Sequence, residues 1–189
     1  MADAAENKEY NLYRDIRSRT NGEVYLGVVG PVRTGKSTFI RRFMELLVLP
    51  FMEDEQEKKR ALDELPQAAA GKTVMTTEPK FIPKQAASIR VQGESAGEAA
   101  PVVKVRLVDC VGFMVDGASG YLEDGGKRMV KTPWFPEEIP FEEAAAFGTQ
   151  KVIKEHATIG IVVTTDGTIG ELLREDYAAA EERTVKELK

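Results

Sequence analysis

Apolar residues gather in short runs that predict the strands of a buried sheet. Val24–Val29 is compact and rich in β-branched residues, with apolar positions on both faces, which predicts a central parallel strand covered by helices on both sides. Ile159–Thr164 has the same character. Val102–Val108 alternates apolar and basic residues, so one of its faces is expected to be less buried. Phe81–Ile82 and Ser88–Val91 are interpreted as two strand pieces around an alanine-rich turn.

Between these runs, apolar residues recur at helical spacing. Residues 37–49 are expected to form a helix that docks on the sheet and is stopped by Pro50. Phe141–His156 and Gly170–Lys189 are two further predicted helices. Strands that alternate with helices in this way predict an α/β fold of three layers with a mostly parallel sheet.

The first residues form a separate unit in this interpretation. Residues 6–19 have the pattern of a short amphipathic helix, which Thr20-Asn21-Gly22 then breaks. The pattern favours a helical arm over residues 1–22, packed on a single domain that spans residues 23–189. A contact with an adaptor or with a second copy is the alternative, because chain termini are often appendages.

Three connections are long or irregular. Residues 51–78 contain a charged stretch and then small residues, and they are expected to form a functional loop or a partly helical lid. Gly93–Pro101 has the composition of a hairpin loop. Residues 112–136 are a second long, glycine-rich segment that ends in Thr-Pro-Trp-Phe-Pro.

Charge narrows the class of partner. The chain of 189 residues carries 31 acidic and 26 basic residues, for a formal net charge of −5. A protein that binds nucleic acid usually has a basic excess, because it displaces counterions from phosphates. Nucleic acid is therefore not expected as a partner.

The cellular compartment follows from what the sequence lacks. Cys110 is the single cysteine, so no internal disulfide can form. The first ten residues are polar and acidic, unlike a signal peptide, and no run approaches the roughly 20 apolar residues of a membrane span. These features predict a cytoplasmic protein.

The strongest motif is a phosphate-binding loop at residues 30–37, with the pattern G-x-x-x-x-G-K-[ST]. Its glycines let successive backbone N–H groups point into one concavity, and the helix that follows adds the positive end of its dipole. Lys36 is expected to contact the β and γ phosphates, and the Ser37 hydroxyl to bind Mg²⁺. The residues expected to bind the nucleotide are Gly30, Pro31, Val32, Arg33, Thr34, Gly35, Lys36, Ser37, Thr38 and Gly112.

A second G-K-T triplet is not a second phosphate loop. Gly71-Lys72-Thr73 follows no apolar strand, and Pro66 stands where the first glycine of the motif belongs. Lys72 therefore has no predicted role at the nucleotide.

The carboxylate that this site requires is predicted at the end of the 102–108 strand. Asp109 begins a D-x-x-G motif, and it is expected to hold Mg²⁺ from the side opposite Ser37. Gly112, the last residue of that motif, lets a backbone N–H approach the γ phosphate. Asp109 alone is a weak signal, because aspartate at a strand end is commonly a turn former. The loop before it makes the assignment specific.

Two threonines and one phenylalanine qualify the chemistry. Thr76 or Thr77 is expected to close over Mg²⁺ and to sense hydrolysis, and the alternative is that they only cap a loop. Phe113 stands where Ras-like GTPases carry a glutamine that positions water, so another group must do so here. Arg33 is a candidate, in the same chain or toward a neighbouring subunit, and a solvated side chain is the alternative.

Several stretches together resemble one family, the stage IV sporulation protein A family of endospore-forming bacteria, in its nucleotide-binding domain. They are residues 25–30, the loop itself, residues 63–67, 76–81, 108–112 and 132–134, and Thr164 to Gly170. The resemblance implies a P-loop fold of the translation-factor-like GTPase superfamily that hydrolyses ATP. It assigns Lys36 as the essential lysine, Asp109 as the Mg²⁺-side aspartate, and Thr76 and Thr77 as the hydrolysis-sensing threonines.

The resemblance also implies a biological role. Members of the family use ATP hydrolysis to assemble into a static homopolymer that forms the basement layer of the spore coat. They lie on the mother-cell side of the outer forespore membrane, held there by a small amphipathic peptide, and they recruit other coat proteins. All of these partners are expectations for this chain.

The end of the chain leaves the base of the nucleotide open. The base-reading motif of this topology is expected on a strand after the 170–189 helix, so the sequence is interpreted as a fragment truncated before the last strands. ATP and GTP therefore both remain possible on the residues alone. The alternatives are a regulatory GTPase switch and a scaffold that binds nucleotide without turnover, with a small-molecule kinase ranked lower.

Overall fold

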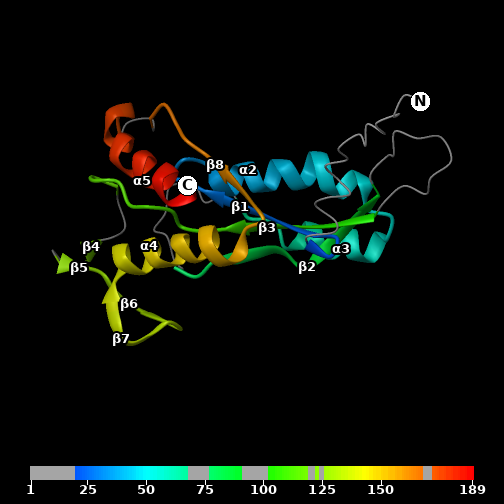
Figure 1. The fold of residues 1–189 in the computed structure, drawn as a ribbon, viewed down its shortest axis with the longest axis horizontal. Coiled ribbons are helices and arrows are strands. Elements are labelled where there is room, and N and C mark those ends of the chain that lie inside the picture. Colours follow the sequence, from blue (N-terminus) through cyan, green and yellow to red (C-terminus); the bar gives the residue numbers. More distant parts are fainter. Residues whose placement is uncertain (1–19, 68–76, 91–101, 119–121, 124–125, 168–171) are drawn as a thin grey trace, which may run out of the picture.

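The structure is a computed structural model that describes residues 20–67, 77–90, 102–118, 122–123, 126–167 and 172–189. Residues 1–19 of the predicted helical arm, Thr76 and the Gly93–Pro101 loop lie outside these residues. Figure 1 shows a central sheet with helices on both of its faces.

The sheet has four strands in the order β2-β3-β1-β8. They are β1 (Glu23–Val29), β2 (Lys80–Arg90), β3 (Val102–Asp109) and β8 (Ile159–Val162). Strand β1 pairs in parallel with both β3 and β8, whereas β2 runs antiparallel at one edge. The prediction of a central parallel strand is therefore confirmed for β1, and the mostly parallel α/β sheet is confirmed with it.

The prediction of two strand pieces near residues 81–91 is wrong. A single strand, β2, runs from Lys80 to Arg90 and pairs with β3 on either side of a register shift between Ile82 and Ala87. Pro83 lies within this irregular stretch, and proline is tolerated there because an edge strand has no second neighbour that needs its N–H. The alanine-rich stretch is therefore a bulge in one strand and not a turn between two.

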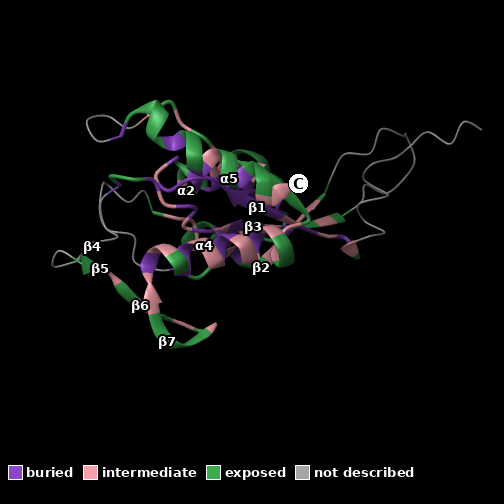
Figure 2. Cartoon of the chain, turned by 60° about the vertical axis from the view of Figure 1, so that its left-hand side comes forward, coloured by how far each residue is buried: buried purple, intermediate pink, exposed green. Residues whose placement is uncertain are grey.

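Helices cover the two faces of β1. Helix α2 (Lys36–Phe43) continues through η1 (Met44–Val48), and α4 (Phe141–Lys151) continues through η3 (Val152–His156). Val28 packs with Ile40 and Met44 on one face, and Val29 packs with Val152 on the other. Figure 2 shows the buried residues concentrated between these layers, which is the arrangement that apolar positions on both faces predict.

One predicted helix boundary is confirmed and one changes. The helix from residue 36 ends at Val48, before Pro50, and a separate short 3₁₀ turn, η2 (Leu49–Phe51), follows, where proline fits near a helix start. The last helix begins later than Gly170, with η4 (Arg174–Tyr177) followed by α5 (Ala178–Leu188). The Asp176 carboxylate accepts a hydrogen bond from the Leu173 N–H at 2.7 Å, which fixes this start.

Both long connections contain regular structure. Helix α3 (Glu55–Asp63) confirms the partly helical 51–78 segment, and Asp54 caps it by accepting from the N–H groups of Gln56 and Glu57. The glycine-rich 112–136 region includes two small antiparallel pairs that the sequence does not predict. They are β4 (Leu122–Glu123) with β5 (Gly126–Lys127), and β6 (Met129–Thr132) with β7 (Phe135–Pro140).

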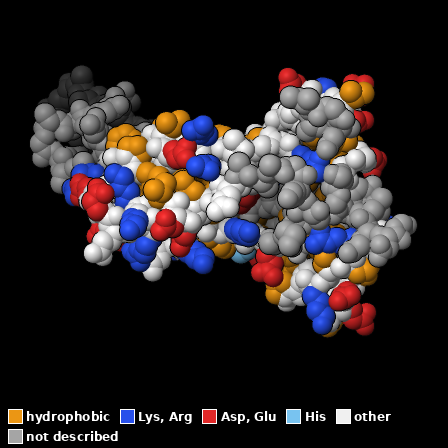
Figure 3. Space-filling model, turned by 180° about the vertical axis from the view of Figure 1, so that it is seen from behind, with side chains coloured by type: hydrophobic (Ala, Val, Ile, Leu, Met, Phe, Trp, Pro, Cys, Tyr) orange, Lys and Arg blue, Asp and Glu red, His pale blue; other side chains and the backbone are white. Residues whose placement is uncertain are grey.

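The surface carries charges of both signs. On the face drawn in Figure 3, basic and acidic side chains are interspersed, with apolar side chains between them. Within the residues that the structure describes, no helix is long and apolar enough to cross a membrane.

The close approach of η3 to β1 generates a stability prediction. A Cβ atom at Gly27 would lie 2.6 Å from the Ala157 Cβ and 3.0 Å from a Val152 methyl. Gly27→Ala is expected to lower the free energy of unfolding by about 1–3 kcal/mol, because neither neighbour can rotate away. Chemical denaturation measures this loss.

Gly160→Ala is the matched control on β8. The added Cβ would lie 2.6 Å from the Leu188 Cδ2, the far end of a flexible side chain that can move aside. Its effect is expected to stay within about 0.5 kcal/mol. Equal losses in the two variants would contradict the packing that we describe at Gly27.

Candidate functional site

The loop at residues 30–37 leaves the carboxyl end of β1 and turns into α2. Gly30 has φ 145° and Gly35 has φ 86°, two conformations that a side chain disfavours. A Cβ atom at Gly30 would also lie 2.2 Å from the Val163 carbonyl oxygen on the segment after β8. Backbone geometry thus requires the two glycines of the motif, which let the loop turn directly into the amino end of α2.

The Lys36 side chain is folded back onto its own loop. It is 5% exposed, and its Nζ donates to the Pro31 carbonyl oxygen at 2.5 Å. The Thr34 hydroxyl donates to the same oxygen at 3.0 Å. Burial lowers the pKa of the Lys36 ammonium, although Cys110 and Asp109 partly oppose this. A desolvated cation whose hydrogen-bond acceptor is a neutral carbonyl would be stabilised by an anion.

Asp109 and Ser37 meet across the first two parallel strands. Asp109 ends β3 opposite Val28 of β1, and the Ser37 hydroxyl donates to the Asp109 Oδ2 at 2.8 Å. Burial raises the pKa of the Asp109 carboxyl, while Ser37 and Lys36 act in the opposite direction. The structure therefore brings together two residues that stand 72 positions apart in the chain.

The oxygens of this pair fit a small hard cation. The Asp109 Oδ1 is buried and accepts no hydrogen bond from the residues that the structure describes, so it has a lone pair to offer. A carboxylate with a hydroxyl suits Mg²⁺, which usually takes one or two protein ligands together with phosphate oxygens and waters. In the described part of the chain, no group of three or more His, Cys, Asp or Glu side chains could hold a metal alone. A cation at this pair would depend on phosphate for its other ligands.

Gly112 packs directly on the loop. It has φ 97°, and a Cβ atom there would lie 2.1 Å from the Gly30 carbonyl oxygen and 2.7 Å from the Lys36 Nζ. The D-x-x-G glycine therefore lies beside the loop lysine. Its N–H, however, donates to the Thr149 Oγ1 at 3.2 Å.

Sequence reasoning missed Thr149. This residue lies on α4, is fully buried, and donates its own hydroxyl to the Ala145 carbonyl oxygen at 2.8 Å. The signal was available as a polar residue within an otherwise apolar helix face, Phe141–Val152. That signal alone does not identify Gly112 as the partner, because the two residues are brought together only by the tertiary fold.

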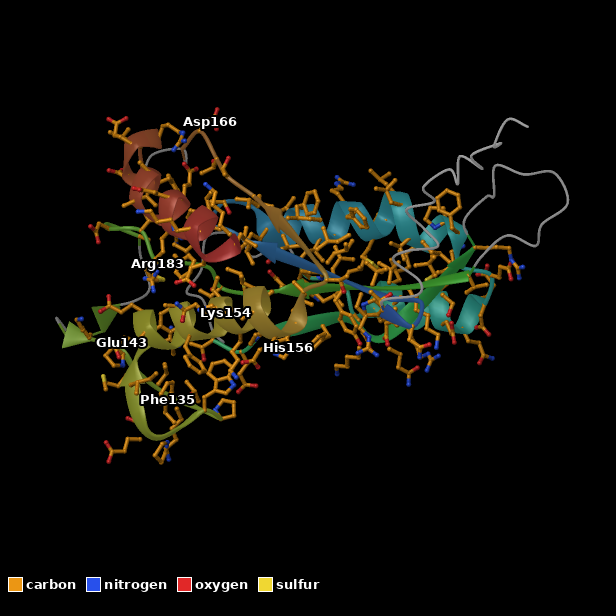
Figure 4. The ribbon with its side chains drawn as sticks, viewed as in Figure 1. Phe135, Glu143, Lys154, His156, Asp166 and Arg183 are labelled. Carbon is orange, nitrogen blue, oxygen red and sulfur yellow. The ribbon has the colours of Figure 1, made fainter. Side chains whose placement is uncertain are left out.

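Phe113 is a core residue. Its side chain is 1% exposed and packs with Val32 and Tyr177, and the Arg183 guanidinium carbon lies 4.3 Å from the centre of its ring. Arg183 reaches it from α5 and is labelled in Figure 4. The Phe113 carbonyl oxygen also accepts from the Val32 N–H at 2.8 Å, which ties this residue to the loop. An apolar side chain here serves packing, and the orientation of water by another group stays a prediction.

For the remaining predicted residues that it describes, the structure gives a degree of burial or a backbone conformation. Thr77 is buried, and a Cβ atom at Gly148 of α4 would lie 2.5 Å from the Thr77 carbonyl oxygen. Thr76 lies outside the described residues. Arg33 has a positive φ of 63°, and Thr38 is exposed on α2. The roles of these four residues stay predictions.

Comparison with known proteins gives one family. A sequence model of the stage IV sporulation protein A ATPase domain matches residues 7–189. The chain is 59% identical to stage IV sporulation protein A of Bacillus anthracis, 58% identical to that of Bacillus subtilis strain 168, and 53% identical to that of Clostridioides difficile strain 630. The matches cover 95–96% of this chain but 35–36% of the relatives, so the chain spans about a third of their length. No solved structure matches.

The buried Asp109 carboxyl generates a prediction about stability. Because burial raises its pKa, the charged form destabilises the folded protein at neutral pH. Asp109→Asn keeps an oxygen for the Ser37 hydroxyl and removes the charge. The melting temperature of the nucleotide-free protein is expected to rise, by about 2–4 °C for each 1 kcal/mol relieved.

Asp116→Asn is the control, because Asp116 is exposed and its charge is already solvated. Differential scanning calorimetry at pH 7 should show little change for this variant. A lower melting temperature for Asp109→Asn would mean that the charged carboxylate stabilises the empty site.

Proposed function

This chain belongs to the stage IV sporulation protein A family, within its ATPase domain, and we propose that it binds ATP with Mg²⁺ at residues 30–37 and hydrolyses it. The observation that carries the proposal is the Ser37–Asp109 hydrogen bond beside the buried Lys36. A phosphate-loop enzyme needs a lysine and a hydroxyl from the loop and a carboxylate from a neighbouring strand for phosphoryl transfer. Lys36 and Ser37 come from the loop, and Asp109 comes from the end of β3.

We place the domain in the P-loop class of acid-anhydride hydrolases, with the translation-factor-like GTPases. The topology supports this assignment. The loop leaves the carboxyl end of β1, beside the carboxyl end of β3, and β1 lies between β3 on one side and β8 on the other, both parallel to it. Ligands of open α/β sheets bind outside the carboxyl ends of strands at such a point.

Each residue has a defined part in the reaction. The loop N–H groups and the amino end of α2 bind the phosphates, and Lys36 exchanges the Pro31 carbonyl for phosphate oxygens. Ser37 and Asp109 hold Mg²⁺, which when bound neutralises charge that develops on the phosphates. Thr77 is a further Mg²⁺ ligand, and Thr76 or Thr77 senses hydrolysis. Gly112 offers its N–H to the γ phosphate.

We propose the biological role from the family. The relatives are named stage IV sporulation proteins, and a nucleotide site that includes two long connections can change shape on hydrolysis. Hydrolysis would drive self-assembly into a homopolymer at the base of the spore coat. The proposed setting is the mother-cell side of the outer forespore membrane, with a small amphipathic anchoring peptide and other coat proteins as partners.

Substitution of the loop lysine tests the site. Lys36→Ala in the full-length protein is expected to lower phosphate release from ATP by about 10²–10³-fold. The substitution removes the lysine ammonium that stabilises negative charge on the transferring phosphate. Filament formation, followed by sedimentation, is expected to fail with it. Asp109→Asn should have the same two effects.

Lys72→Ala is the matched control, since Lys72 occupies the other G-K-T triplet. It should retain turnover and assembly. Normal turnover by Lys36→Ala or by Asp109→Asn would refute the site.

Competition between nucleotides tests the base and the coupling to assembly. ATP is expected to displace a labelled ATP analogue from the full-length protein more effectively than GTP does. Phosphate release per subunit is expected to rise with protein concentration, because assembly and turnover depend on one another. A strong GTP preference would favour a regulatory switch. Thermal stabilisation by ATP without any phosphate release would favour a scaffold.

A further inference from the structure

The Gly112 N–H has a partner other than phosphate. It donates at 3.2 Å to the Thr149 hydroxyl oxygen, inside a layer that solvent does not reach. A backbone N–H is a single donor, so it cannot serve Thr149 and a phosphate oxygen at full strength together. Thr149 and the γ phosphate are therefore competitors for one hydrogen.

The surroundings make this a competition between two orientations of a peptide. Gly112 lies against the loop, since a Cβ atom there would be 2.7 Å from the Lys36 Nζ, yet its N–H points to α4. A terminal phosphate bound by Lys36 would therefore lie close to Gly112. The Val111–Gly112 peptide must rotate to present its N–H to that phosphate, and glycine at φ 97° tolerates such a rotation better than other residues do.

Thr149 itself is held firmly. It is fully buried, and its hydroxyl hydrogen is given to the Ala145 carbonyl one helical turn earlier, at 2.8 Å. This bond orients an oxygen lone pair toward Gly112. Because this acceptor is held rigidly on a helix, it favours the peptide orientation in which the Gly112 N–H donates to Thr149 whenever no competing acceptor is present.

We propose that Thr149 is a positioning residue for the Val111–Gly112 peptide, and that it sets how strongly the site distinguishes ATP from ADP. The proposal rests on the nucleotide site proposed above. Without a γ phosphate, Thr149 keeps the Gly112 N–H on α4. With a γ phosphate, the N–H turns to the nucleotide, and the Thr149 oxygen on α4 loses its bond. ADP, which lacks that phosphate, leaves the Thr149 bond intact.

Thr149→Val tests this, because valine keeps the shape of the side chain and removes the acceptor. Affinities of the full-length protein for ADP and for the slowly hydrolysed analogue ATPγS, each with Mg²⁺, are measured by calorimetry. The competing bond is worth a factor of about 2–10 in an equilibrium constant. The ratio of ATPγS to ADP affinity is therefore expected to rise by about that factor. Thr149→Ser, which keeps the hydroxyl, is expected to retain the wild-type ratio.

Thr184→Val is the matched control. Thr184 is also a fully buried helical threonine, and its hydroxyl donates to the Ala180 carbonyl at 2.8 Å as Thr149 donates to Ala145. Removal of this hydroxyl costs stability in the same way but leaves Gly112 untouched. Its affinity ratio should equal that of the wild type.

The outcomes separate the two proposals. If wild-type protein binds neither ATPγS nor ADP, the nucleotide site fails and this inference fails with it. If wild-type protein binds ATPγS and ADP but Thr149→Val keeps the wild-type ratio of ATPγS to ADP affinity, only the role of Thr149 is refuted. The same holds if Thr149→Ser shifts the ratio as far as valine does, because the hydroxyl is then not the cause.

Discussion

The parallel pairing of β1 with β3 is the constraint on which the site depends. Val28 lies opposite Asp109 in this register, so the two strands end together and deliver the phosphate loop and the carboxylate to one edge of the sheet. A slip of one residue would turn Asp109 to the other face, because side chains alternate along a strand. In the observed register the Ser37 hydroxyl reaches the Asp109 Oδ2 at 2.8 Å.

That register is specified by packing and not by the polar pair. Leu107 and Val28 belong to the cluster that α2 covers, and Val108 and Val29 belong to the cluster that η3 covers. Both faces of β1 and β3 are thus buried, and burial of this kind specifies the register strongly. Asp109 at the end of β3 and Lys36 at the start of α2 are buried by this packing, and burial disfavours the charged forms of both. Ionisable groups perturbed in this way cluster at functional sites.

Much of this could be predicted from the sequence, because the signals are local. The loop motif, the strand before it and the helix after it are contiguous, and the motif itself states where glycine is needed at Gly30 and Gly35. Asp109 follows from its place at a strand end. The β2 bulge was not predictable in this way, because it results from pairing with β3 across a register shift. Thr149 was missed for the same reason, since its partner Gly112 lies 37 positions away.

The arrangement around Phe113 explains why a movement at Gly112 cannot stay local. The Phe113 ring is enclosed by a cluster that includes Val32 of the loop and Tyr177 before α5, with Arg183 against its face. Protein interiors are close-packed, so a rotation of the Val111–Gly112 peptide must either strain this ring or shift the residues around it. Glu187 of α5 in turn contacts the α4–η3 helix at two points. Its Oε2 lies 3.2 Å from the Lys154 Nζ, and its Oε1 accepts a hydrogen bond from the Gln150 Nε2 at 2.7 Å. Helices α4 and α5, which border Gly112 and Phe113, are therefore in contact with each other. A rotation of the Val111–Gly112 peptide that shifts the residues around the ring would displace both helices.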